Sequence, residues 1–302
     1  MLLIEKLTVL PSGLGIHFIG SYGGDAWVLE KGGDAVLLDA GFPFCAEQTA
    51  QEAARILDGR PPGAILLSHS HYDHIGGVAA YRRAFPGAPV YAAAGMQKVC
   101  TSETAHAMMK KLNATAASYA GLGEGPDFTD GLAIDRVAAE GDRITCGALS
   151  CAVWETPGHT NDSLGFYFEA DGLLTLTETA GIFARTPAIL SEPAVVVSWK
   201  KSLACVRRAR EAAPGALLLS HSGVLQGAEV GEYLDSIERA ILFTKDLVFQ
   251  RAKEGRPPEE TVMEFKALFF DKRPGAAQGM QPPDAFLANY AAMVPRILAE
   301  GE

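Results

Sequence analysis

The sequence lacks the features of a membrane-spanning chain and of a nucleic-acid-binding protein. No uninterrupted apolar stretch approaches the roughly 18 residues of a transmembrane helix, so no membrane partner is expected. The N-terminal segment Met1–Lys6 is interrupted by charge too early for the apolar region of a signal peptide. A net charge of −10 argues against a nucleic-acid groove, which needs a basic stripe that displaces counterions.

Motifs for a protein nucleophile and for paired cysteines are also absent. Gly-x-Ser-x-Gly does not occur, and we find no Ser-His-Asp or Cys-His constellation. The cysteines, which form no Cys-x-x-Cys pair, are Cys45, Cys100, Cys146, Cys151 and Cys205. Cys151 alternates with Leu149 and Val153, so we expect it to be a small core residue on a strand. This cysteine usage predicts a reduced, cytoplasmic location.

The sequence does contain a dense cluster of histidines. His69-Ser-His71-Tyr-Asp73-His74 places three imidazoles and one carboxylate within six residues, directly after the apolar run Ala64–Leu67. An apolar run that stops at histidines predicts a buried strand that delivers metal ligands at its end. His69 and His71 are two residues apart, so in an extended segment both rings point the same way. A tight turn then brings Asp73 and His74 toward a second position, which suits two metal ions.

Two further histidines lie in positions that suit metal ligation. His159 occurs in Thr-Pro-Gly-His-Thr and His221 in Leu-Ser-His-Ser-Gly. The alternative is that such histidines are satisfied polar groups of the surface, which is the better explanation for a lone histidine but not for a six-residue cluster. We therefore predict a metal site.

These motifs resemble the metallo-β-lactamase superfamily, and the resemblance runs through most of the first 225 residues. The matching segments are Trp27–Glu30, Ala35–Gly41, Glu140–Ile144, Leu149–Val153 and Thr156–Thr160. The resemblance implies that Asp39 orients the histidine cluster, as anchored imidazoles generally require. It also implies that His159 completes a first metal site with His69 and His71. His221 then completes a second site with Asp73 and His74.

One position departs from the superfamily pattern. An aspartate that bridges the two ions usually follows a strand there, whereas Glu178 follows the strand Gly172–Thr177 in this chain. Glutamate keeps the carboxylate but is one methylene longer, so bridging requires the backbone to retreat or the side chain to fold. We expect Glu178 to bridge the ions. The alternative is that it is only a carboxylate of the pocket and that the second ion binds weakly.

The implied ligands are five imidazoles and two carboxylates, which suit two divalent ions, either zinc or iron and also manganese. A water shared by two such ions becomes hydroxide near neutral pH and can attack an ester-type carbonyl. Asp73 can ligate the second ion and relay a proton, so it is the predicted catalytic residue. We expect a small acyl substrate, either a thioester of the acyl-coenzyme A kind or a lactone. Phosphodiester hydrolysis is the alternative reaction, because a two-metal clamp suits phosphoryl oxygens equally well.

A regulatory binding protein of the same fold is the second class of function. Ser102–Ala105, Lys111–Asn113, the ligand spacing and the helical C-terminal extension resemble the quinolone-signal response thioesterases. That resemblance implies hydrolysis of a coenzyme A thioester and action through a protein partner. Thioester hydrolysis of the glyoxalase II type also stays open, although the glutathione-contacting residues of that group cannot be mapped onto this C-terminus.

Alternating strand and helix patterns predict an α+β fold, an αββα metallo-β-lactamase sandwich in which two packed mixed sheets have helices outside. The catalytic domain is predicted at residues 1–225, with a helical insertion at about 95–120 and Ala216–Leu219 as its last strand. Residues 226–302 are predicted to form a helical cap packed on the same domain.

The Gly- and Pro-rich segment 271–283 lies between two helical patterns and is a candidate wall of the substrate pocket. The apolar candidates for that wall are Phe270, Met280 and Phe286. The alternative is that this part of the chain is a homodimer contact or plain packing.

Overall fold

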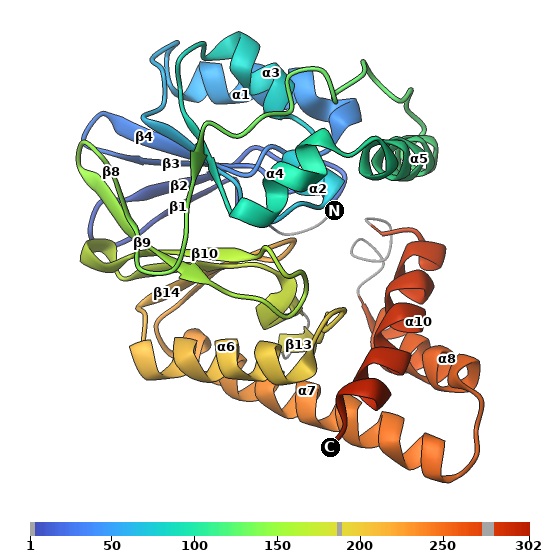
Figure 1. Cartoon of the computed structure of the whole chain (residues 1–302). Helices are drawn as coiled ribbons and strands as arrows, with labels where there is room; N and C mark the ends of the chain where they lie inside the picture. Colours follow the sequence, from blue (N-terminus) through green and yellow to red (C-terminus); the bar gives the residue numbers. More distant parts are fainter. Residues whose placement is uncertain (1–3, 186–188, 274–280) are drawn as a thin grey trace. The chain divides into compact units, whose positions relative to one another are not determined.

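The computed structural model describes residues 4–185, 189–273 and 281–302, which belong to two compact units (Figure 1). The larger unit consists of Ile4–Glu155 and Asp162–Leu174. The smaller unit contains Thr156–Asn161 and the described part of Thr175–Glu302. The boundary that the sequence predicts at residue 225, between a catalytic domain and a helical cap, stays a prediction.

The larger unit is built on a seven-stranded mixed sheet whose strands lie in chain order. Its strands are β1 (Leu7–Val9), β2 (Gly15–Phe18), β3 (Trp27–Lys31), β4 (Asp34–Leu38), β5 (Ala64–Leu66), β6 (Val90–Ala92) and β7 (Arg136–Val137). Strands β1 to β4 pair antiparallel, whereas β4 to β7 pair in parallel. Parallel neighbours need long crossovers, so the helices of this unit lie in these connections.

Helices α1 (Ala46–Ile56) and α3 (Val78–Ala84) belong to the crossovers on either side of β5 and pack against each other (Figure 1). β5 is apolar throughout because a covered parallel strand is buried on both faces. The core beneath these helices includes Leu37, Ile65 and Val90, none of which is exposed.

The segment predicted as one helical insertion contains two helices. Helix α4 spans Ala94–Thr101 and helix α5 spans Glu103–Tyr119. The break lies at Ser102, whose Oγ accepts a hydrogen bond from the Ala105 backbone N–H at 3.2 Å and so caps the N-terminus of α5. A single capping serine inside a helical pattern is a weak signal, so the sequence does not reveal the break.

Three more strands of the larger unit are antiparallel neighbours: β8 (Arg143–Cys146), β9 (Leu149–Glu155) and β10 (Leu164–Phe168). Leu149, Cys151 and Val153 of β9 are almost completely buried. Burial raises the pKa of the Cys151 thiol to about 12, so the thiol is neutral near pH 7. The prediction that Cys151 is a small core residue on a strand is therefore confirmed.

The smaller unit contains two antiparallel hairpins. One consists of β12 (Ile182–Arg185) and β13 (Ile189–Glu192), and the other of β14 (Ala216–Leu219) and β15 (Gly223–Gln226). β11 (Leu173–Leu176) is the neighbour of β14 on its other side. The prediction that β14 is the last strand is wrong, because β15 follows after a three-residue turn. β15 is short, and Leu225 is its one fully buried side chain. So few apolar residues make the strand difficult to recognise in the sequence.

Long helices complete the smaller unit: α6 (Trp199–Ala212), α7 (Ala228–Lys253), α8 (Pro258–Leu268) and α10 (Pro283–Glu300) (Figure 1). Glu300 accepts a hydrogen bond from the Trp199 backbone N–H at 3.0 Å and also contacts the Ser198 hydroxyl. A carboxylate at the N-terminus of α6 is favourable because its negative charge lies at the positive end of the helix dipole. Within the residues that the structure describes, no helix is long and apolar enough to cross a membrane.

A buried ion pair connects the C-terminal helices to the β12–β13 hairpin. Arg273 donates to both carboxylate oxygens of Glu192, at 2.5 and 2.8 Å, and the two side chains are 6% and 7% exposed. The guanidinium also lies over the rings of Phe270 and Phe286, at 5.0 and 5.5 Å from their centroids. Because this pair is bidentate and enclosed, removal of one partner leaves a buried charge without its counter-charge.

We predict that Arg273→Met lowers the free energy of unfolding by about 3–5 kcal/mol, because Glu192 then stays buried without its counter-charge. Adding Glu192→Gln to the same chain should recover much of that loss. Urea denaturation followed by circular dichroism measures both differences. The control is Arg207→Met, which breaks a more exposed pair with Glu238 and should cost at most about 1 kcal/mol. An Arg273→Met variant no less stable than this control contradicts the prediction.

Candidate metal centre

Parallel pairing of β4 with β5 brings Asp39 next to the start of the histidine cluster. Leu38 and Leu66 are register partners, and each is the last residue of its strand. The Asp39 backbone N–H donates to the Leu66 carbonyl at 2.9 Å. Asp39 and Ser68 therefore meet at the carboxyl edge of the parallel strands, where open α/β sheets place their functional groups.

Asp39 accepts three hydrogen bonds that determine how two imidazoles are oriented. The Ser68 backbone N–H and hydroxyl donate to its carboxylate at 2.8 and 2.7 Å, and His74 Nδ1–H donates at 2.8 Å. Because Ser68 donates its single hydroxyl hydrogen to Asp39, Ser68 Oγ accepts from His69 Nδ1–H at 3.1 Å. His69 and His74 thus carry their proton on Nδ1, which makes Nε2 the ring nitrogen that could bind a metal.

The backbone around Asp39 is closely packed. Asp39 is 2% exposed and has a φ of +55°, a left-handed conformation in which aspartate is enriched among non-glycine residues. A Cβ at Gly77 would lie 2.1 Å from the Ala40 carbonyl oxygen, and one at Gly76 would lie 2.3 Å from Pro43 Cδ. These glycines allow the segment that follows the histidine cluster to lie directly against Asp39–Pro43.

Asp73 and His74 lie on α2 (Tyr72–Ile75), a single helical turn that His71 directly precedes. His71 is extended, with φ −73° and ψ 145°, and its carbonyl accepts from the His74 backbone N–H at 3.0 Å. The His69 ring is 4.6 Å from the His71 ring and 4.1 Å from the His74 ring, measured between centroids. Asp73 Oδ2 is 3.9 Å from His74 Nε2. The turn therefore gathers four predicted ligands within the larger unit.

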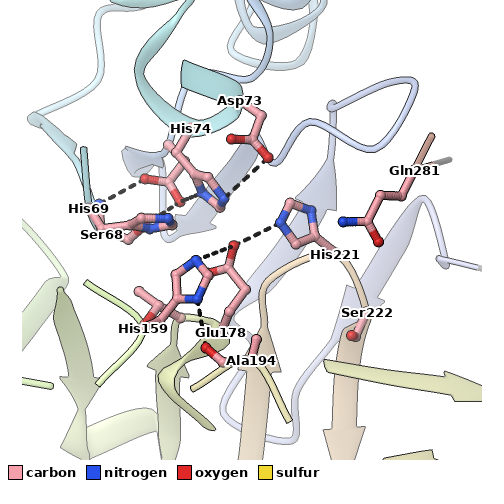
Figure 2. A network of polar contacts seen from close by, with 12 residues as sticks. Ser68, His69, Asp73, His74, His159, Glu178, Ala194, His221, Ser222 and Gln281 are labelled. Atoms are coloured by element: carbon pink, nitrogen blue, oxygen red, sulfur yellow. Dashed lines mark hydrogen bonds and ion pairs between the residues drawn. The ribbon is translucent and has the colours of Figure 1, made fainter. Parts of the chain in front are cut away.

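His159, in the smaller unit, is oriented by the same kind of contact (Figure 2). Its Nδ1–H donates to the Ala194 carbonyl at 2.8 Å, and its backbone N–H donates to Thr179 Oγ1 at 3.0 Å. Because a carbonyl only accepts, Nε2 is again the nitrogen that is left for a metal. The ring is 4% exposed, and a Cβ at Gly158 would lie 2.3 Å from Ser202 Oγ, which shows how closely this segment packs.

Glu178 contacts His159 and His221 within the smaller unit. Its Oε1 is 2.8 Å from His221 Nε2 and 3.8 Å from His159 Nε2 (Figure 2). Glu178 opens a short 3₁₀ turn, Glu178–Ala180, and the hydroxyl of Tyr233 on α7 donates to the Ala180 carbonyl at 2.7 Å. His221 lies in the turn between β14 and β15 with φ +59°, as three-residue hairpin turns require of one residue.

The seven predicted ligands are thus divided between the units. The larger unit contains His69, His71, Asp73 and His74, and the smaller unit contains His159, Glu178 and His221. The sequence did not predict the position of Asp25, which is 1% exposed and offers a carboxylate oxygen within 4.8 Å of a ring nitrogen of His74. A single aspartate before β3 belongs to no motif, so only the folded chain reveals it.

The predicted pocket residues lie among the C-terminal helices. Phe270 and Phe286 are 5% and 1% exposed, and their ring centroids are 5.2 Å apart. Met280 lies outside the residues that the structure describes. The role of these residues as a substrate-pocket wall stays a prediction.

Aromatic rings border the histidine cluster in the larger unit. Phe42 lies 5.5 Å from Tyr72 and stacks on Phe44 at 4.9 Å, and Tyr22 lies 6.0 Å from Phe44. Burial and the neighbouring Asp73 raise the pKa of Tyr72, so its phenol is neutral near pH 7. Tyr72 lies between His71 and Asp73 in the chain, so this group of rings begins at the histidine cluster.

Comparison with known proteins identifies the family. The profile of the metallo-β-lactamase superfamily matches residues 19–221, more than half of the chain, and this range includes every predicted ligand. The chain therefore belongs to the metallo-β-lactamase superfamily, as its motifs predicted.

A hydroxyacylglutathione hydrolase of Xanthomonas campestris pv. campestris is 29% identical over 177 residues, which cover 57% of this chain and 51% of that protein. The chain spans about half the length of the curated relatives it matches. Their names do not single out the quinolone-signal response thioesterases.

Solved structures support the fold. A metallo-β-lactamase family protein of Thermus thermophilus is similar with a TM-score of 0.60 and 16% identity, over 99% of this chain and 95% of that one. A β-lactamase domain protein of Burkholderia ambifaria gives 0.61 and 17%, over 100% and 91%. The predicted fold class is confirmed: the chain has the α+β metallo-β-lactamase fold, with two mixed sheets, helices and a C-terminal helical extension.

We predict that Asp39→Asn weakens the binding of a divalent ion by about 10- to 100-fold. The amide cannot accept all three hydrogen bonds, so His69 and His74 lose their fixed orientation. Asparagine tolerates a left-handed φ, so the backbone is preserved. Isothermal titration of metal-free protein with zinc measures the change. The control is Asp58→Asn, at an exposed position with φ +50°; equal affinities in the two variants contradict the role of Asp39.

Proposed function

We propose that this chain is a metal-dependent hydrolase of small acyl thioesters. One observation carries the proposal: Nδ1 of His69, His74 and His159 is bound to a fixed acceptor at 3.1, 2.8 and 2.8 Å. The same nitrogen, Nε2, is thereby left for a metal in each of the three rings. Histidines that only filled the interior would have no reason to share this arrangement. Metal binding is also typical of the superfamily to which the chain belongs.

We assign the ligands to two divalent ions, either zinc or iron and also manganese. The first set is His69, His71 and His159, and the second is Asp73, His74 and His221, with Glu178 as the bridge. Two findings support this assignment of the ligands. The family match covers both ligand groups, and Glu178 already contacts one imidazole of each set, since His159 belongs to the first and His221 to the second.

Bound divalent ions supply Lewis acidity, which activates water near neutral pH and polarises a carbonyl group. The residues of the chain orient this chemistry. Asp39 and Ser68 fix the imidazoles of the larger unit, and the Ala194 carbonyl fixes His159. Asp73, whose carboxylate lies beside His74, can accept the proton of the attacking water and pass it to the departing thiolate.

Two findings support a thioester as the substrate. The curated relatives are named hydroxyacylglutathione hydrolase, and that name describes a thioester hydrolase. Tyr72 lies between His71 and Asp73 in the chain, and Phe42 packs against it, so these two rings provide apolar surface at the histidine cluster. A lactone fits the same carbonyl chemistry. The thiol part, coenzyme A or glutathione, is distinguished by a substrate panel, and the homodimer and the regulatory protein partner stay predictions.

We predict that His71→Ala removes at least one equivalent of metal and abolishes thioester hydrolysis, because three imidazoles are needed to hold one ion with an open position. Elemental analysis gives the metal content. Rates are measured on coenzyme A thioesters, glutathione thioesters, acyl-homoserine lactones and phosphodiesters. The control is His106→Ala, the same substitution on α5 and outside the ligand set.

Full metal content and normal rates in His71→Ala would overturn the ligand assignment. Phosphodiester turnover that exceeds thioester turnover in the wild-type protein would favour the alternative reaction. A regulatory binding protein predicts a third pattern, in which a partner is bound equally well by wild-type protein and by the metal-free variant.

We further predict that mild chelation removes the ion bound by Asp73, His74 and His221 first. Glu178 Oε1 is 2.8 Å from His221 Nε2, a direct hydrogen bond, so this pair must separate by several tenths of an ångström to admit an ion with ligand bonds of about 2.1 Å. Elemental analysis during a chelator titration should show one equivalent leaving before the other. Simultaneous loss contradicts this order. Glu178→Asp should bind less metal than wild type if the backbone has adapted to the longer side chain.

A further inference from the structure

The loop that precedes β3 brings a buried carboxylate to the histidine cluster. Asp25 is 1% exposed and offers an oxygen within 4.8 Å of a ring nitrogen of His74. Because Nδ1 of that ring donates to Asp39, the nitrogen left for a metal is Nε2, which is also 3.9 Å from Asp73 Oδ2. Two carboxylates therefore flank one ligand imidazole inside the larger unit.

The backbone fixes Asp25 on both sides. Its N–H donates to the Asp73 carbonyl at 3.2 Å, and its own carbonyl accepts from the Gly41 N–H at 2.7 Å. A Cβ at Gly24 would lie 2.8 Å from the Phe42 backbone nitrogen, so the loop is closely packed just before it. The backbone of Asp25 is thus joined directly to the turn that carries Asp73 and His74.

We infer that Asp25 is a further ligand of the second ion, beside Asp73 and His74. Donors of one ion with bonds of about 2.1 Å lie roughly 3–4 Å apart. Asp73 Oδ2 lies 3.9 Å from His74 Nε2, and an oxygen of Asp25 lies within 4.8 Å of a ring nitrogen of His74, so a small side-chain movement brings all three to one ion. Carboxylates that are buried in proteins are typically paired with a cation or bound to a metal. The inference rests on the proposed dinuclear centre and adds one residue to it.

The additional carboxylate changes the chemistry of the second site. With Asp25, Asp73 and the bridging Glu178, that ion has more oxygen than nitrogen donors. Oxygen-rich sets suit manganese and iron better than sets dominated by imidazole. The first site, with three imidazoles, has no comparable excess of oxygen.

The test is a titration of metal-free protein with Mn²⁺, in which electron paramagnetic resonance of the free ion counts bound equivalents. Asp25→Asn should bind the first equivalent as wild type does and the second at least about 10-fold more weakly. The control is Asp171→Asn, which also removes a buried carboxylate of the larger unit, one that pairs with Lys31 at 2.7 Å. Two equivalents bound with wild-type affinity by Asp25→Asn would overturn the inference.

A second variant decides the matter if Asp25→Asn does not fold. Asp25→Cys loaded with Co²⁺ should show a thiolate-to-cobalt charge-transfer band in the near ultraviolet that cobalt-loaded wild type lacks. Absence of that band in folded Asp25→Cys overturns the inference. Wild-type protein that binds fewer than two Mn²⁺ ions overturns the dinuclear centre itself, whereas two ions in both wild type and Asp25→Asn reject only the role of Asp25.

Discussion

The candidate centre depends on one recurrent constraint, the hydrogen bond that three of its five imidazoles donate from Nδ1. His74 donates to Asp39, His69 to Ser68, and His159 to a backbone carbonyl. Each bond selects one tautomer and one ring orientation, and each leaves Nε2 as the ligating atom. Because Asp39 receives the hydroxyl of Ser68 as well as the ring of His74, a single carboxylate controls two ligands.

The fold supplies these acceptors from structure that is not itself part of the site. Asp39 and Ser68 meet because β4 and β5 are parallel and end at the same edge of the sheet. In the smaller unit, Tyr233 of α7 donates to the Ala180 carbonyl and so supports the turn that begins at Glu178. Helix α7 thus contributes to the position of a predicted ligand. The buried pair of Glu192 and Arg273 connects the chain after α8 to the β12–β13 hairpin.

The sequence revealed those parts of the site that depend on residues close together in the chain or on a known family pattern. A histidine cluster after an apolar strand predicts ligands at a strand end, and the superfamily pattern predicted Asp39 as the residue that orients them. Contacts between distant segments could not be read in this way. Asp25 approaches His74 only because the chain before β3 packs against the turn at Asp73. The break at Ser102 and the strand β15 were missed for a different reason, since short elements with few apolar residues give weak periodic signals.

The most direct test of the central claim is anomalous diffraction from a crystal of the metal-loaded protein, recorded at the absorption edge of the bound metal. The account predicts two peaks, one bound by Nε2 of His69, His71 and His159 and the other by His74, His221 and carboxylates. Nδ1 of His69, His74 and His159 should keep its hydrogen bond. A single peak, or ligation through Nδ1 of any of these three histidines, would contradict the account.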